Sequence, residues 1–238
     1  MTQTTVPVIF DLDGTLVDPA GGITDGIASA LRELGHPVPS QELLEAMIGP
    51  KLSDALLTVA QVPADGLHEV IRLYRRYYLA QGIAQSRLYP GMLDVLDSFA
   101  AAGRPVAVAT QKPEGLARIV LEHHGIAGKF SFIRGSADDE SAAAAGPVGK
   151  SGIIAAALGD LVTQHAVMVG DRAQDVAGAI ANGLDCIGVS WGFAPDGELE
   201  NAGAVTVVDT APDLVAAIER LEAVHTAAMS EVHNDGTV

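Results

Sequence analysis

The sequence is poor in cysteine and in basic residues, and it has no long apolar run. Cys186 is the single cysteine, so an internal disulfide and a zinc site of four thiolates are both excluded. Lys and Arg together number 14 against 30 Asp and Glu, which gives a formal net charge of −16. We therefore expect no binding to nucleic acid or to an anionic membrane surface, because both require an excess of Lys and Arg.

Signals for export and for membrane insertion are also missing. No stretch approaches the roughly 18 consecutive apolar residues of a membrane span. Residues 1–7 (MTQTTVP) lack the basic start and the apolar body of a secretion signal. These absences predict a cytoplasmic protein with no membrane partner, and they leave the oligomeric state open.

The apolar residues are arranged in short runs. They make up 48% of the 238 residues, enough for a sizeable core in one or two domains. Continuous β-branched runs predict strands that are covered on both faces. They lie at 6–10, 105–109, 166–169, 186–189 and, more weakly, 205–208. Helical patterns lie between them at 92–102, 114–124, 152–158, 175–181 and 213–224. This alternation predicts an α/β fold whose core is a Rossmann-like parallel sheet.

The stretch from about residue 19 to 87 breaks the alternation. It carries helical patterns separated by Gly and Pro, at 26–34, 41–47, 52–60 and 67–80. We interpret it as an all-helical cap inserted into a catalytic core of residues 1–18 and 88–225, at the strand ends where open α/β sheets bind ligands. Residues 226–238 are predicted to be a flexible tail, and the small, acidic segment 136–146 a mobile loop.

Two closely spaced carboxylates follow the first predicted strand. Asp11 and Asp13 stand in the sequence Asp-Leu-Asp-Gly-Thr directly after the run 6–10. Such acids repel each other and lose hydration, which a fold tolerates mainly where a cation or a reaction needs them. An ordinary turn is the alternative interpretation, because Asp and Gly both favour turns.

A second pair of acids follows another predicted strand. Asp171 comes just after the run 166–169, and Asp175 lies four residues further on, one turn into the next helix. A helix cap is the alternative role for Asp171. Two parallel strands that both end in paired acids favour a cation site, and carboxylate oxygens are ligands that Mg²⁺ prefers.

A hydroxyl and two ammonium groups complete the set. Thr110 directly follows the predicted strand at 105–109, and Lys112 lies two residues further on. Lys150 precedes a predicted helix. Acids that hold a hard cation, with a hydroxyl and an ammonium beside them, can bind a phosphoryl group that a free carboxylate attacks.

These pieces, in this order, resemble the haloacid dehalogenase superfamily of phosphotransferases, and the resemblance covers nearly the whole chain. Further segments resemble its phosphoglycolate phosphatase-like branch. They are 48–52 (IGPKL), 89–91 (YPG), 169–176 (VGDRAQDV), 181–183 (ANG) and 188–192 (GVSWG). The resemblance implies an Mg²⁺-dependent phosphatase of a small phosphorylated metabolite such as 2-phosphoglycolate.

The resemblance also implies roles for the acids and lysine named above. Asp11 would form an aspartyl-phosphate, and Asp13 would act as acid and base while its carbonyl joined Asp11 and Asp171 as Mg²⁺ ligands. Lys150 would neutralise the phosphoryl oxygens and restrain Asp11. Asp175 would support Lys150 or the metal from outside the ligand set.

Other positions are candidates for contact with substrate. Thr110 would hydrogen-bond the transferring phosphoryl oxygens, and Gln111 follows it where relatives often have Asn. The remaining candidates are Gly14, Thr15, Lys51 and Arg172.

Several alternatives stay open at this point. Within the superfamily they are a 5′-nucleotidase, a sugar-phosphate phosphatase and a phosphomutase, and Thr15 favours hydrolysis because the Asp-Gly-Thr form is usual in phosphatases. Outside it, Gly149-Lys150-Ser151 resembles a nucleotide-binding phosphate loop, but no buried strand precedes it directly. A receiver-type signalling domain would also gather acids, a hydroxyl and a lysine, but in about half this length and without a cap.

Overall fold

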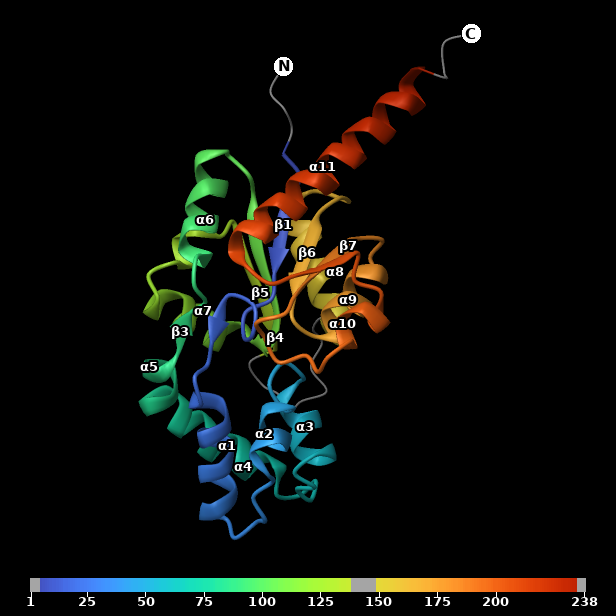
Figure 1. Cartoon of the computed structure of the whole chain (residues 1–238). Helices are drawn as coiled ribbons and strands as arrows, with labels where there is room; N and C mark the ends of the chain where they lie inside the picture. The colour runs from blue at the N-terminus through green and yellow to red at the C-terminus, as the bar shows by residue number, and fades with distance from the viewer. Residues whose placement is uncertain (1–4, 138–148, 235–238) are drawn as a thin grey trace.

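The structure, a computed structural model, describes residues 5–137 and 149–234, with side chains as far as residue 224 (Figure 1). Most of the loop predicted to be mobile therefore lies outside the described residues. No helix in these two ranges is long and apolar enough to cross a membrane.

Six parallel strands form the central sheet, in the order β5-β4-β1-β6-β7-β8. The strands are β1 (Val8–Phe10), β4 (Val106–Pro113), β5 (Phe132–Ser136), β6 (Val167–Gly170), β7 (Asp185–Val189) and β8 (Thr206–Val208). In the register of the central strand, Ile9 lies opposite Ala107 on one side and Met168 on the other. The predicted α/β class with a parallel sheet is confirmed.

Helices cover both faces of this sheet, because successive side chains of each strand point to opposite faces. Val8 and Phe10 pack with helices on one face, whereas Ile9 packs on the other. The first face carries α6 (Met92–Ala101), α7 (Glu114–His123) and α11 (Ala211–Asn234), and the second carries α8 (Gly149–Leu161), α9 (Ala173–Ile180) and α10 (Glu198–Ala202).

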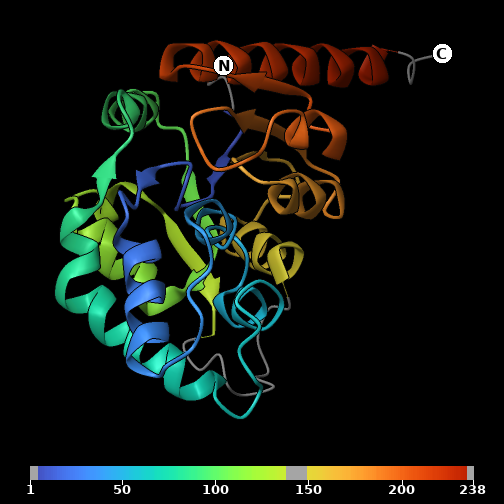
Figure 2. The same cartoon turned by 60° about the horizontal axis from the view of Figure 1, so that its bottom comes forward.

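A helical segment lies beyond one end of the sheet, at the bottom of Figure 1. It runs between β2 (Val17–Asp18) and β3 (Arg87–Leu88), which pair antiparallel as a separate two-stranded ribbon. Its helices are α1 (Gly22–Glu33), α2 (Gln41–Glu45), α3 (Leu52–Thr58), α4 (Leu67–Tyr77), a π-helical turn at Tyr78–Gly82 and α5 (Ile83–Gln85). Figure 2, which brings this end forward, shows α1 and its neighbours in front of the strands.

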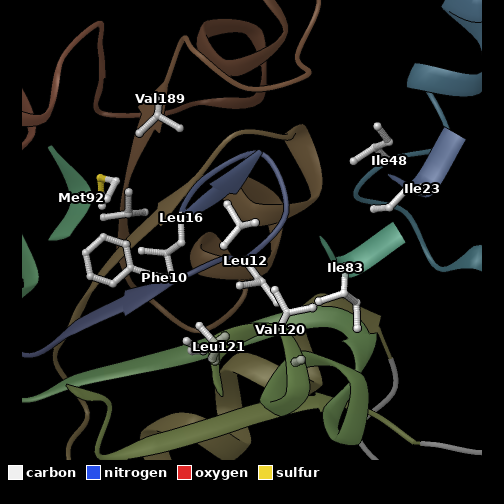
Figure 3. Packing of buried hydrophobic residues seen from close by; sticks show 14 of the residues in the cluster. Phe10, Leu12, Leu16, Ile23, Ile48, Ile83, Met92, Val120, Leu121 and Val189 are labelled. Carbon is white, nitrogen blue, oxygen red and sulfur yellow. The ribbon is translucent and has the colours of Figure 1, made fainter. Parts of the chain in front are cut away.

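One apolar cluster joins the helical segment to the sheet. Figure 3 shows Phe10 and Leu16 of the core among buried side chains, with Ile83 of the helical segment facing Val120 of α7. Ile48, after α2, belongs to the same cluster. Burial of such side chains stabilises by about 1.5–3 kcal/mol each, so the helical segment is held against the core by packing.

Two differences from the sequence predictions concern β5 and the end of α11. β5 was not predicted, because its sequence Phe-Ile-Arg-Gly-Ser has no continuous apolar run and it lies at the sheet edge, where Phe132 is 36% exposed. Helix α11 continues to Asn234, where a non-periodic tail was predicted from residue 226. Ala227, Ala228 and Met229 favour helix, and no Gly or Pro interrupts the chain before Gly236.

Candidate active site

The acidic residues meet at the carboxyl edge of the sheet. Asp11 directly follows β1 and Asp171 directly follows β6, and these strands are parallel neighbours. Asp175 lies in the first turn of α9. One oxygen from each of the three carboxylates lies within 4.8 Å of the others, and all three residues are buried.

Lys150 lies between two of these acids. Its ammonium is 2.5 Å from Asp11 Oδ1 and 2.6 Å from Asp175 Oδ1. Burial alone would lower the pKa of the Lys150 ammonium, but the two carboxylates outweigh it and raise that pKa above its ordinary value. Lys150 therefore stays charged and fixes the Asp11 side chain.

Asp175 occupies a mixed environment. Burial raises the pKa of its carboxyl to about 6, against the lowering effect of Lys150. One of its oxygens accepts a hydrogen bond from the Arg172 amide at 3.0 Å, which ties the start of α9 to the site.

Asp171 is enclosed by two loops. Its Oδ1 accepts a hydrogen bond from the Thr15 hydroxyl at 3.1 Å, and its Oδ2 accepts one from the Phe193 amide at 2.9 Å. A Cβ at Gly14 would lie 2.1 Å from Oδ2, and one at Gly192 would lie 2.3 Å from the Asp171 Cβ. Only glycine fits at these two positions, and Asp171 is bound from both sides rather than acting as the N-cap of α9, which is Arg172.

The donor set fits a divalent cation. Burial raises the pKa of Asp171 well above its ordinary value, and the charges of Asp175 and Asp11 raise it further. Three buried carboxylates this close repel one another, and a proton or a cation among them relieves that repulsion. Hard oxygen ligands are those that Mg²⁺ prefers, so Asp11, Asp171 and Asp175 can hold such an ion.

Asp13 forms a second buried ion pair. Its Oδ2 accepts a hydrogen bond from the Lys112 ammonium at 2.5 Å, whereas Oδ1 is buried without a hydrogen-bond partner among the described residues. Burial raises the pKa of Asp13 despite the lowering effect of Lys112. The Lys112 ammonium also lies 4.7 Å above the Tyr78 ring, a cation–π distance.

Thr110 and Gln111 lie beside this pair on β4. The strand continues to Pro113, whereas the sequence predicted its end at 109. The Thr110 Oγ1 accepts a hydrogen bond from the Lys112 amide at 3.2 Å, and Thr110 and Gln111 both line the site.

A cavity of about 40 Å³ lies between the strand ends and the helical segment. Asp11, Asp13, Thr110, Gln111 and Lys112 line it from the core. The opposite wall is apolar and includes Ile23, Met47, Ile48, Leu52 and Tyr74 of the helical segment.

The other sequence candidates lie around the cavity rather than on its wall. Gly14 and Thr15 pack against Asp171, as described above. Lys51 is the N-cap of α3, between Pro50 and Leu52, which do line the cavity. Arg172 donates to the Ile48 carbonyl at 2.8 Å and to Glu198 at 3.1 Å, so its guanidinium joins the core to the helical segment.

Sequence reasoning did not find the apolar wall or the Phe193 amide. Met47 and Tyr74 stand in ordinary helical patterns, and a backbone donor leaves no trace in the sequence. The spacing Thr110-Gln-Lys112 did signal a second ammonium, but not that Asp13 is its partner.

Comparison with known protein families places this geometry in context. The family model described as haloacid dehalogenase-like hydrolase matches residues 8–189. The chain is 37% identical over 206 residues to the protein named tyrosine-protein kinase PtkA of Mycobacterium tuberculosis, covering 86% of this chain and 68% of that protein. It is 34% identical over 194 residues to a 5′-nucleotidase of Pseudomonas aeruginosa, covering 81% and 86%.

Two further similarities concern phosphatases. A phosphoglycolate phosphatase of Rhodospirillum rubrum is 33% identical over 214 residues, covering 85% of this chain and 86% of that protein. The crystal structure of a predicted phosphatase from Clostridium acetobutylicum aligns with a TM-score of 0.83 at 33% identity, covering 91% of this chain and 99% of the other.

Proposed function

The chain belongs to the haloacid dehalogenase-like hydrolases, as a phosphatase with a phosphoglycolate phosphatase-like sequence, and we propose that it hydrolyses a small phosphomonoester through Asp11 with the aid of Mg²⁺. The observation that carries the proposal is the placement of Asp11. Its carboxylate lines the cavity while Lys150 holds one of its oxygens, and the second acid, Asp13, lines the same cavity.

In the first step, an oxygen of the Asp11 carboxylate forms a bond to phosphorus as the ester P–O bond breaks. Lys150 orients Asp11 and offsets the charge that gathers on the phosphoryl oxygens. The Thr110 hydroxyl, which faces the cavity, donates to one of those oxygens. The product is an aspartyl-phosphate on Asp11 and a free leaving group.

Asp13 moves the protons in both steps. In its acid form it gives a proton to the leaving alkoxide, and the raised pKa of the buried carboxyl favours that form. As a carboxylate it then takes a proton from water, whose oxygen attacks phosphorus and frees Asp11. The hydrogen bond from Lys112 fixes the position of the Asp13 carboxylate.

Asp11, Asp171 and the Asp13 carbonyl are the proposed Mg²⁺ ligands, with Asp175 supporting them through Lys150. A bound Mg²⁺ would neutralise phosphoryl charge and draw the phosphate toward Asp11. An oxygen of Asp175 lies within 4.8 Å of oxygens of Asp11 and Asp171, near enough for it to be a direct ligand instead.

The segment 19–87 is proposed to act as a movable cap over a core of 1–18 and 88–225. The cavity lies between the strand ends and this segment, so an outward movement of the helical wall would widen the entry for a phosphate ester. Closure afterwards excludes bulk water while the phosphoryl group is transferred.

The acceptor of the phosphoryl group separates hydrolysis from kinase or mutase chemistry. PtkA carries a kinase name, and a kinase that used the sequence Gly149-Lys150-Ser151 as a phosphate loop would need that lysine for the nucleotide. Lys150 instead pairs with Asp11 and Asp175. We therefore favour water as acceptor, with Asp13 as its base.

The experiment is an assay of phosphate release from p-nitrophenyl phosphate by the full chain. Activity is expected with Mg²⁺ and is lost on chelation, and Asp11→Asn lowers kcat by at least about a thousandfold. Asp97→Asn, which removes an exposed acid paired with Lys129, is the matched control and keeps activity. Metal-independent turnover, or full activity of Asp11→Asn, contradicts the proposal.

A further inference from the structure

The cavity has no cation free to bind a second anionic group. All 14 Lys and Arg residues of the chain fall within the residues that the structure describes. Lys112 is the one among them that lines the cavity, and its ammonium is already bonded to Asp13. Lys150 is held by two carboxylates, and Arg172 by Glu198 and a carbonyl.

The cavity wall opposite the carboxylates of the site is formed mainly by apolar side chains. Ile23, Met47 and Tyr74 are nearly fully buried, with exposed fractions of 6%, 2% and 6%. Leu52 of α3 and Leu116 of α7 line the same cavity and are half-buried. Lys51 stands next to Leu52, but its side chain is not part of the lining.

The net charge of the site also disfavours binding of a second anionic group. Asp11, Asp13, Asp171 and Asp175 carry four carboxylates against the two ammonium groups of Lys112 and Lys150. A carboxylate on the leaving group would enter this cavity without a partner, which is costly in a buried site.

We propose that the substrate is a phosphate ester of an uncharged alcohol or phenol, whose apolar part packs against Ile23, Leu52 and Tyr74. This inference rests on the proposed phosphatase function and narrows its substrate class. It separates the chain from enzymes that act on 2-phosphoglycolate, where a carboxylate lies next to the ester oxygen.

The test compares kcat/KM of the full chain with Mg²⁺ for two substrates, 2-phosphoglycolate and 2-phosphoglycolamide, in which an uncharged amide replaces the carboxylate. The two esters have nearly the same shape and differ in one charge. We expect kcat/KM for the amide to exceed that for the acid by about tenfold or more. Equal values, or a preference for the acid, overturn the inference and leave the phosphatase function intact. If neither ester nor p-nitrophenyl phosphate is hydrolysed, both the inference and the phosphatase function are overturned.

A second arm adds a cation to the apolar wall. Leu52→Lys is expected to raise the acid-to-amide ratio of kcat/KM by about tenfold, because the ammonium supplies the missing partner. Leu57→Lys is the control, on the same helix but 39% exposed and outside the lining. An unchanged ratio in Leu52→Lys, or an equal rise in Leu57→Lys, overturns the inference.

A second matched pair, on α7 at the core side of the cavity, keeps the inference testable if Leu52→Lys does not fold. Leu116→Lys on α7 is expected to raise the same ratio, and Ile119→Lys, 42% exposed on the same helix, is expected to leave it unchanged.

Discussion

The ammonium of Lys112 lies 2.5 Å from the Oδ2 of Asp13, and both side chains are more than nine-tenths buried. The same ammonium stacks over the ring of Tyr78, at the π-helical turn of the helical segment. This contact joins the second acid of the site to the strand end of β4 and to the helices that close the cavity. Lys112 is therefore a positioning residue for Asp13.

Lys112→Met is expected to lower kcat by about tenfold or more while KM changes little, because Asp13 loses the group that orients it. The loss is larger for alkyl phosphates than for p-nitrophenyl phosphate, since a poor leaving group depends more on the general acid. Steady-state kinetics with both ester types measure this.

The matched control removes an ion pair of the same type from the surface. Lys129→Met breaks the contact with Asp97, whose side chain is 56% exposed, and keeps wild-type kinetics for both esters. Equal losses for the two esters in Lys112→Met would indicate a merely structural role.

Gly192→Ala is expected to destabilise the fold by about 1–3 kcal/mol and to weaken activation by Mg²⁺. The new Cβ would lie 2.4 Å from Asp171 Oδ2, so the carboxylate must shift. Urea unfolding and a Mg²⁺ titration of activity measure the two effects. Gly128→Ala, where a Cβ meets no atom within 4 Å, is expected to change stability by less than about 0.5 kcal/mol. A Gly192→Ala variant with wild-type stability and Mg²⁺ dependence would contradict the packing argument.

His124 makes stability depend on pH. Its Nε2 lies 2.9 Å from the Ser86 Oγ, and partial burial, then the charge of His123, lowers the pKa of its imidazole from 6.5. The unfolded chain thus binds this proton more tightly than the folded one. The stability is fully present above about pH 6.5 and is lost as pH falls toward the folded pKa.

Urea unfolding at about pH 7.5 and about pH 5.5 measures this dependence. The wild type is expected to lose more stability over this range than His124→Gln, which cannot titrate. Equal losses in the two proteins, or a gain in the wild type, would show that His124 is not responsible.

The sheet could be predicted where its strands are buried on both faces. The runs at 6–10, 166–169 and 186–189 are apolar throughout, and they became β1, β6 and β7 within a residue or two at either end. The edge strand β5 was missed because exposed Phe132 and polar Arg134 interrupt its pattern. A short edge strand is specified by pairing with β4, which its own residues do not encode.

The site was predictable as far as strand ends and parallel pairing determine it. Asp11 and Asp171 had to meet once their strands were neighbours. The pairing of Lys112 with Asp13 depends instead on β4 continuing past Thr110, against the apolar-run rule. The apolar wall depends on how the helical segment packs over the strand ends, which helical periodicity does not specify.

Detection of the phosphoryl-enzyme tests most directly whether Asp11 is the nucleophile. The full chain is mixed with p-nitrophenyl phosphate and Mg²⁺, quenched in acid within the first turnover and digested, and the peptides are analysed by mass spectrometry. One phosphoryl group is expected on the peptide that contains Asp11, and none after the same treatment of Asp11→Asn. A phosphoryl group on another residue, or hydrolysis with no phosphoryl-enzyme at any quench time, would contradict the assignment of Asp11 as the nucleophile.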